Sequence, residues 1–145
     1  MLIEERAAED GELAELLDAA FAELVARYGP EGRSHVKDGA RFLVASVDGR
    51  AVGCGAVQPV DDLTGELKRM FVLPEYRGRG IATSILGALE GLAWDLGYRR
   101  LRLATGLRQP EAIALYERCA YRPIEPYGKY VDAPLTRCYE KPLAQ

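Results

Sequence analysis

The stretch Val72-Leu73-Pro74-Glu75-Tyr76-Arg77-Gly78-Arg79-Gly80-Ile81-Ala82 joins an apolar segment to a long amphipathic one through a glycine-rich turn. The apolar start predicts a strand, and the aliphatic spacing after the turn predicts a helix. Free N–H groups at the start of a helix point outward, and the helix dipole adds partial positive charge. Glycines let the backbone come close to a ligand, and Arg77 and Arg79 add charge. The stretch therefore predicts a site for an anion such as phosphate.

Other glycine-rich motifs do not match this turn. The dinucleotide pattern GxGxxG requires glycine at position 83, where the chain has Thr83, and the Gly-Lys-Ser/Thr of a Walker A motif is absent. Arg-Gly-Arg-Gly also occurs in disordered RNA-binding segments, but this turn lies between two ordered elements. A plain strand–turn–helix junction without a ligand is the simplest alternative.

Length and composition predict a single domain over residues 1–145, with no repeat or linker to divide it. The chain has 19 Lys and Arg against 22 Asp and Glu, a net charge of −3, which argues against nucleic acid binding through bulk charge. No apolar run approaches the roughly 18 residues of a membrane span, and the N-terminus lacks the features of a signal peptide. We therefore expect a cytoplasmic protein with no nucleic acid or membrane partner, and a homodimer is left open.

Cysteine and histidine usage limits the chemistry. Cys54, Cys119 and Cys138 are widely spaced and form no CxxC pair, which indicates reduced, mostly buried thiols. The single His35 lies in a polar stretch and is interpreted as a solvated side chain, so no His-based metal site or serine-type triad is expected. The sequence predicts no metal. Its chemistry must rely on carboxylates, tyrosines, backbone amides or a borrowed cofactor.

Hydrophobic periodicity predicts a mixed α/β domain. Strands are expected at 2–6, 42–47, 51–57, 66–72, 101–105 and 136–141, and helices between Asp10 and Gly29, from Ile81 to Leu96 and at 110–119. Residues 31–40 are expected to form a loop, Asp48-Gly49 a hairpin turn, and 59–65 a second turn. Gly53 and Gly55 indicate a place where backbone or a ligand approaches closely. Antiparallel hairpins precede the alternating part, so the sheet should be mixed.

Arg77-Gly78-Arg79-Gly80-Ile81-Ala82 resembles motif A of the GNAT family of N-acetyltransferases, Q/R-x-x-G-x-G/A, at every fixed position. The resemblance implies a GNAT fold, a twisted mixed sheet flanked by helices, with acetyl-CoA as co-substrate. It also implies that these six residues hold the pyrophosphate through turn amides. The pantetheine arm would then run beside Met70, Phe71 and Val72, where two neighbouring strands splay apart.

A second stretch is similar to the family signature N-x-x-A-x-x-L-Y-E-x-x-G-F/Y. Ala112, Leu115-Tyr116-Glu117 and Tyr121 match it, whereas Gln109 replaces the usual Asn and Ala120 the usual Gly. Gln109 carries the same amide groups one methylene further out, so it is expected to contact the cofactor. The two motifs together cover only residues 66–121.

Acetyl transfer to an amine needs a group that accepts the amine's proton, because an alkylamine is mostly protonated near pH 7. Glu66 lies six residues before Val72 on the strand that leads to the turn, or about 20 Å along an extended chain. The family resemblance implies a carboxylate base at this position. The alternative is a surface carboxylate paired with a cation of the neighbouring strand.

Tyr116 is the second catalytic candidate, and by resemblance it also touches the cofactor. The tyrosine of the L-Y-E signature supplies or orients a proton for the CoA thiolate. Ala112, Leu115 and Cys119 share its expected helix and would pack inward, leaving Tyr116 to line a cleft. The alternative is an aromatic anchor packed on the sheet with its hydroxyl bonded to backbone.

The expected reaction is direct transfer of acetyl from acetyl-CoA to a primary amine of a small molecule in a ternary complex. Two alternatives stay open: a GNAT-fold module that binds acetyl-CoA without turnover, and an enzyme for a longer acyl-CoA. The segment 126–130 would wall the acceptor pocket or form a surface loop. Lys68 and Arg69 would cover a sheet edge or neutralise an acidic acceptor.

Overall fold

A computed structural model describes residues 1–30 and 36–144. The strands in that part of the chain are β1 (Leu2–Arg6), β2 (Arg41–Val47), β3 (Arg50–Pro59), β4 (Thr64–Val72), β5 (Arg100–Gly106), β6 (Arg122–Ile124) and β7 (Thr136–Pro142). The helices are α1 (Gly11–Tyr28), α2 (Ile81–Asp95) and α3 (Pro110–Arg118), with short 3₁₀ turns η2 (Pro74–Tyr76) and η3 (Gly128–Tyr130). No helix among these residues is long and apolar enough to cross a bilayer.

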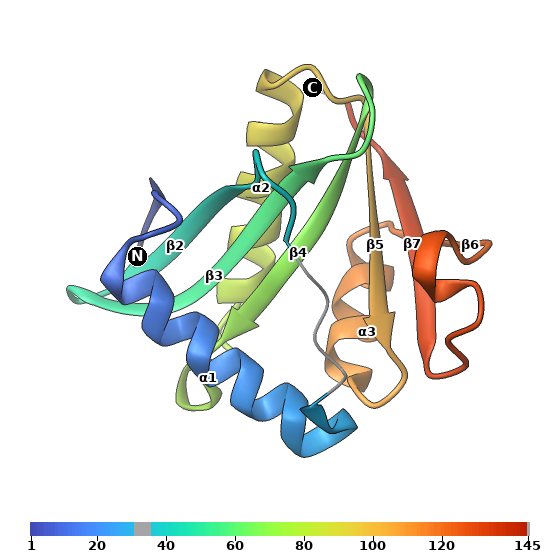
Figure 1. The fold of residues 1–145 in the computed structure, drawn as a ribbon. Coiled ribbons are helices and arrows are strands. Elements are labelled where there is room, and N and C mark those ends of the chain that lie inside the picture. The colour runs from blue at the N-terminus through green and yellow to red at the C-terminus, as the bar shows by residue number, and fades with distance from the viewer. Residues whose placement is uncertain (31–35, 145) are drawn as a thin grey trace.

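The described strands form one sheet in the order β1-β2-β3-β4-β5-β7-β6 (Figure 1). Only the β4–β5 pair is parallel, and every other neighbouring pair is antiparallel. The predicted mixed sheet with flanking helices is therefore confirmed. The strand β6 and both 3₁₀ turns were not expected, and β4 begins two residues earlier than predicted. The predicted loop at 31–40 lies partly outside the described residues, as does His35.

Helices cover both faces of the sheet. Helix α1 lies in front of β2, β3 and β4 in Figure 1, and its Leu13 and Leu16 pack with Phe42, Val44 and Phe71. Helices α2 and α3 lie on the opposite face, where they contribute to the larger apolar core. The two cores share the strands between them, so each face of β3 and β4 is buried and both strands are rigidly held.

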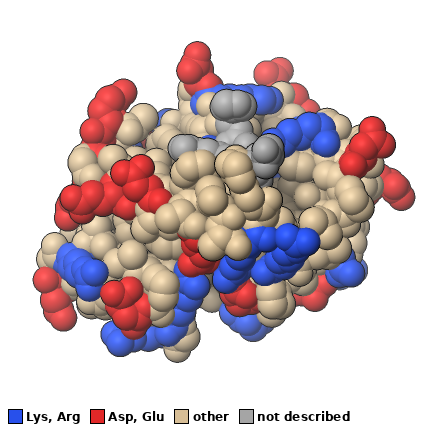
Figure 2. Space-filling view, turned by 60° about the horizontal axis from the view of Figure 1, so that its bottom comes forward, with Lys and Arg blue, Asp and Glu red and all other residues tan. Residues whose placement is uncertain are grey.

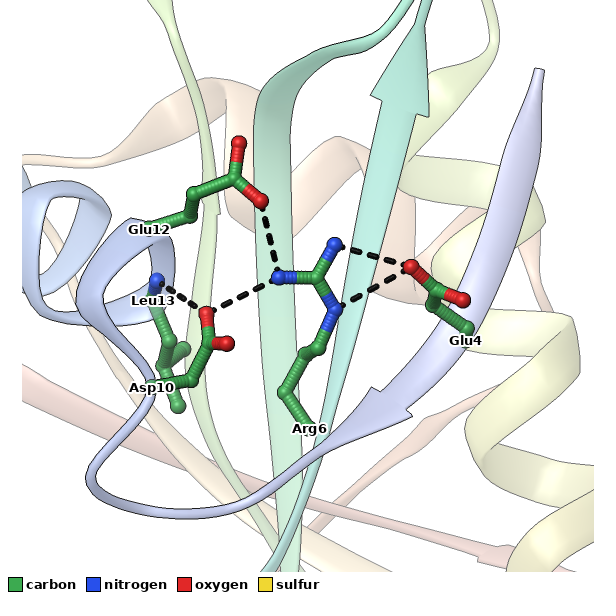
Figure 3. A network of polar contacts seen from close by, with 5 residues as sticks. All are labelled: Glu4, Arg6, Asp10, Glu12 and Leu13. Carbon is green, nitrogen blue, oxygen red and sulfur yellow. Dashed lines mark hydrogen bonds and ion pairs between the residues drawn. The ribbon is translucent and has the colours of Figure 1, made fainter.

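The start of α1 is tied to β1 by a charged network (Figure 3). The carboxylate of Asp10 accepts a hydrogen bond from the Leu13 amide at 3.0 Å, so Asp10 caps the helix as the sequence predicted. The guanidinium of Arg6 reaches Asp10 and Glu12 at 2.9 Å each, and Glu4 at 2.8 Å. These contacts fix where α1 enters the face of the sheet.

Two glycines allow α2 to approach β3 closely. A Cβ atom at Gly55 would lie 2.7 Å from both Leu89 Cδ1 and Met70 Sδ, and one at Gly53 would lie 2.9 Å from Ile85 Cδ1. The close approach expected at these glycines is therefore made by side chains of α2 and β4. Larger residues there would force the helix away from the sheet.

The strands β4 and β5 pair over only three residue pairs, from Thr64–Arg100 to Glu66–Arg102. Beyond Glu66 both strands continue, β4 to Val72 and β5 to Gly106, without pairing to each other. Figure 1 shows them side by side at the top and separating toward the bottom. Beyond Glu66 and Arg102 the two strands therefore form no sheet hydrogen bonds with each other.

Candidate active site

The separation of β4 and β5 opens into a cleft of about 760 Å³. Its walls come from β4, β5, α1, α3 and η3, and it extends to the turn before α2. Figure 2 looks onto the end of the molecule where the two strands separate, and basic side chains gather near the middle of that face around uncharged residues. A cleft of this size is within the usual range of sites that bury a small-molecule ligand.

The glycine-rich turn lies at the wide end of this cleft and keeps its amide groups open. Gly78 and Gly80 have φ angles of 79° and 80°, in the left-handed region that side-chain-bearing residues rarely adopt. The first backbone hydrogen bond of α2 runs from the Ser84 amide to the Gly80 carbonyl at 3.1 Å. Amides 78–83 donate to no acceptor within the described residues. No acidic residue lies in the first turn of α2, so the site suits an anion.

Arg77 has a structural partner that the sequence did not show. Its Nε donates to the Val72 carbonyl at 2.9 Å, and its Nη2 donates to Glu23 of α1 at 2.7 Å. Arg77 therefore ties α1 and the end of β4 to the turn. Arg79 is exposed, with its guanidinium carbon 5.0 Å from the centre of the Tyr76 ring. Arg79 therefore has fewer polar contacts than Arg77.

A β-bulge interrupts β4 inside the cleft. Lys68 pairs with Ala56 and Phe71 with Cys54, so Arg69 and Met70 together oppose the single Gly55. Arg69 has a φ angle of 59°, an uncommon conformation for a residue with a side chain. Such bulges often occur beside active sites, where they redirect the strand. Here the bulge lies on the strand expected to run beside the pantetheine arm.

Glu66 is buried, with 4% of its surface exposed. Its carboxylate lies 3.4 Å from Lys68 Nζ and 3.4 Å from Nε of Arg102 on β5. The pairing with a neighbouring-strand cation, which the sequence offered as the alternative to a catalytic role, is therefore present, although Glu66 is not at the surface. Glu66 lies outside the cleft lining, whereas the next residues, Leu67 and Lys68, are part of it.

Tyr116 lines the cleft from α3 and is 6% exposed. Its ring packs edge-to-face on Tyr121, with centroids 5.7 Å apart. Its hydroxyl makes no hydrogen bond to any described residue. Burial raises the pKa of the Tyr116 phenol above its usual value, so the group keeps its proton at neutral pH. The residue is both a core aromatic and a cleft residue, and its hydroxyl lacks, among the described residues, the backbone hydrogen bond that the alternative interpretation required.

Cys54 and Cys138 do not offer an activated nucleophile. Burial raises the pKa of the Cys54 thiol to about 12, and its Sγ lies 3.3 Å from the carbonyl oxygen of Arg69. Burial also raises the pKa of Cys138. Both groups are therefore neutral thiols near pH 7. Among the described residues, no group of three His, Cys, Asp or Glu side chains could hold a metal ion.

Most of the predicted cofactor residues meet at the cleft. Those that line it are Met70, Phe71, Val72, Arg77, Gly78, Ile81, Ala82, Gln109 and Tyr116. Arg79 and Gly80 belong to the same turn but lie outside the lining. Sequence reasoning missed Arg102, because its position opposite Glu66 depends on a strand pairing between distant residues. It also missed the contribution of α1, whose Phe21 and Tyr28 form part of the cleft wall.

Comparison with known proteins shows that a chain with this fold and cleft is an acyl-CoA-dependent N-acyltransferase. The model of the acetyltransferase (GNAT) family matches residues 5–121. An IAA acetyltransferase from Azospirillum brasilense is 42% identical over 104 residues, which are 71% of this chain and 68% of the relative. The chain belongs to the GNAT family. Matches to seven further curated N-acetyltransferases span 34–56% of those proteins' lengths.

Solved structures agree with this assignment. A Klebsiella pneumoniae protein named as an acyl-CoA N-acyltransferase is 33% identical and superposes with a TM-score of 0.85, covering 99% of this chain and 97% of that one. A GNAT acetyltransferase from Elizabethkingia anophelis with bound acetyl-CoA has a TM-score of 0.73, covers 98% of this chain and 97% of its own, and is 16% identical. The second likeness shows the fold alone. The expected GNAT fold is confirmed.

Proposed function

We propose that the protein transfers an acetyl group from acetyl-CoA directly to the primary amine of a small molecule, with both substrates bound together. One observation carries the proposal: the cleft runs from Leu67 and Lys68, the residues that follow Glu66 on β4, to the open turn before α2. One continuous cleft could thus place phosphates at the turn and an acyl group near Glu66.

The cofactor site follows from the lining. The amides of the turn Arg77–Ala82 would hold the pyrophosphate, since they face an open space and no acid competes for them. The pantetheine arm would lie beside Met70, Phe71 and Val72, where β4 has no partner on its β5 side. Gln109, which precedes the first turn of α3, would contact the cofactor from the opposite wall.

The two proposed catalytic groups belong to different elements, Tyr116 to α3 and Glu66 to β4. Tyr116, which keeps its proton and has no hydroxyl partner among the described residues, would protonate the departing CoA thiolate. Glu66 would accept the proton of the amine. Because Glu66 lies behind the cleft lining, we assign that transfer to an intervening water.

A screen of amines tests this function. Purified protein, acetyl-CoA and single amines would be combined, and release of free CoA thiol would be measured by absorbance. We expect acetyl-CoA consumption that depends on at least one small primary amine and yields its N-acetyl product. Tight acetyl-CoA binding with no turnover across diverse amines would instead support a binding module.

Gly80→Asp should abolish most of the affinity for acetyl-CoA. The change places a side chain on a residue with φ of 80° and adds a negative charge where the phosphate would sit. We expect at least a tenfold rise in Kd by calorimetry, about the effect of one lost charge-assisted hydrogen bond. Gly97→Asp is the matched control, because Gly97 also has a positive φ, 96°, and open space around it, but it follows the opposite end of α2 from the turn. Unchanged affinity in folded Gly80→Asp protein would remove the turn from the binding site.

The rate should not fall at moderately high pH through loss of a proton from an acidic group. The folded-state pKa of Tyr116 is raised above its usual value, so its proton is retained below about pH 10. Deprotonation of the amine increases as pH rises, so kcat/KM should climb toward about pH 10 without a fall due to Tyr116. Rates would be measured in overlapping buffers from pH 6 to 10. A descending limb below about pH 9 that disappears in Tyr116→Phe would contradict this assignment.

A further inference from the structure

Arg102 lies where β4 and β5 stop pairing, one residue before Leu103, which is the first residue of β5 in the cleft lining. Its guanidinium carbon stands 3.7 Å from the centre of the Tyr127 ring, and its Nη2 lies 3.5 Å from Glu66 Oε1. A quarter of its side chain is exposed. That long contact is its one hydrogen bond to a described residue, although a guanidinium carries five N–H donors.

Two buried polar atoms in this place lack partners. Within the described chain, Nε of Arg102 and the hydroxyl of Tyr127 are the buried side-chain polar atoms that make no hydrogen bond. Nε is 3.4 Å from the Glu66 carboxylate but does not bond to it. Buried donors without acceptors are rare in folded proteins because each costs free energy. Neither residue lines the cleft, but Leu103, which follows Arg102, and Tyr130, which packs edge-to-face on Tyr127, both do, so the two atoms lie just behind the cleft wall.

The cleft next to Arg102 is also basic and rich in hydroxyl groups. Lys68 Nζ donates to the Tyr130 hydroxyl at 3.1 Å, and both residues line the cleft. Among the described lining residues, six are basic and two are acidic: Arg27, Lys68, Arg69, Arg77, Arg118 and Lys129 against Glu23 and Glu111. Arg77 already pairs with Glu23 near the turn, whereas Lys68 and Lys129 lie with Tyr130 at the other end.

We propose that Arg102, Lys68 and the tyrosines of the segment 127–130 bind a carboxylate of the acceptor, so that the natural acceptor is an amino acid or a similar amino-carboxylate. The inference rests on the function proposed above and names its substrate class. A carboxylate accepts paired hydrogen bonds from a guanidinium, which is the geometry that Arg102 offers. Bound there, the acceptor lies at the opposite end of the cleft from the phosphate turn, with its amine directed toward the acyl group.

Matched pairs of acceptors test the carboxylate site. L-phenylalanine would be compared with phenethylamine, and L-lysine with cadaverine, because each pair differs by the carboxylate alone. We expect the wild-type protein to favour the amino acids in kcat/KM. Arg102→Met should lower the preference for each amino acid over its decarboxylated amine, measured as the ratio of their kcat/KM values, by about 10- to 100-fold, because any effect that acts through Glu66 is common to both acceptors. Arg102→Lys keeps the charge but loses the planar pair of N–H donors, so it should retain part of the preference for the amino acids.

Arg137→Met is the control, because it removes the same charge from the neighbouring strand β7 at a residue that forms neither the ion pair with Glu66 nor the ring contact with Tyr127. Melting temperature and acetyl-CoA affinity would show that each variant is folded. If both members of each pair are acetylated and Arg102→Met leaves their ratio unchanged, the carboxylate site is wrong while the proposed function stands. If no amine of either kind is acetylated, both the function and the inference fail.

Discussion

Glu66→Gln should lower kcat by about 10²- to 10⁴-fold, the usual contribution of a positioned base. The substitution keeps the size of the side chain and removes its ability to accept a proton. Acetyl-CoA affinity should change little, because the phosphate turn lies at the other end of the cleft. The rate would be measured at saturating acetyl-CoA and amine, near pH 8.

Glu90→Gln provides a matched control for this prediction. Glu90 is likewise a paired carboxylate, with Lys141 Nζ at 3.0 Å and the Tyr121 hydroxyl at 2.8 Å, but neither of these partners lines the cleft, whereas the Glu66 partner Lys68 does. Both variants lose a paired carboxylate, so a loss of stability alone would affect both. We expect Glu90→Gln to keep wild-type kcat. Full kcat in Glu66→Gln would reduce Glu66 to a structural partner of Lys68 and Arg102.

Tyr116→Phe should lower kcat well over tenfold with little change in melting temperature. The Tyr116 hydroxyl bonds to no described residue, so its removal costs no internal hydrogen bond, and the ring keeps its contact with Tyr121. The lost rate would come from the missing proton for the CoA thiolate, whose pKa as a free thiol is about 8.5. Steady-state kinetics and thermal unfolding would be measured on the same preparation.

Tyr121→Phe separates catalysis from packing in this experiment. Tyr121 packs against Tyr116, yet its hydroxyl donates to Glu90 and not into the cleft. Its loss should cost stability of about 1 kcal/mol and leave kcat unchanged. If Tyr116→Phe also keeps normal kcat, the hydroxyl takes no part in the reaction.

Local patterns in the sequence predicted the elements that carry the site. The aliphatic spacing after Gly80 predicted α2, the alternation around Leu101 and Leu103 agrees with β5, and Asp10 was found as the cap of α1. These features depend on neighbouring residues and on turn chemistry, which a single sequence contains. The positions of the turn and of Tyr116 follow from them.

Features that depend on distant pairing could not be predicted. The opposition of Glu66 and Arg102 arises from the register of two parallel strands, and the bulge at Arg69 from the register of β3 against β4. The strand β6 is three residues long and contains Pro123, so its sequence carries no strand pattern. The contact between Arg77 and Glu23 requires the packing of α1 across the sheet.

Direct transfer is the central claim, and a single mass measurement tests it. Protein and acetyl-CoA in equal amounts would be mixed with an amine accepted in the screen, and the masses of the amine and of the intact protein would be recorded over time. We expect one N-acetylated amine for each CoA released and an unmodified protein mass throughout, as the neutral thiols of Cys54 and Cys138 imply. A protein that gains one acetyl group before the amine is acetylated would contradict direct transfer.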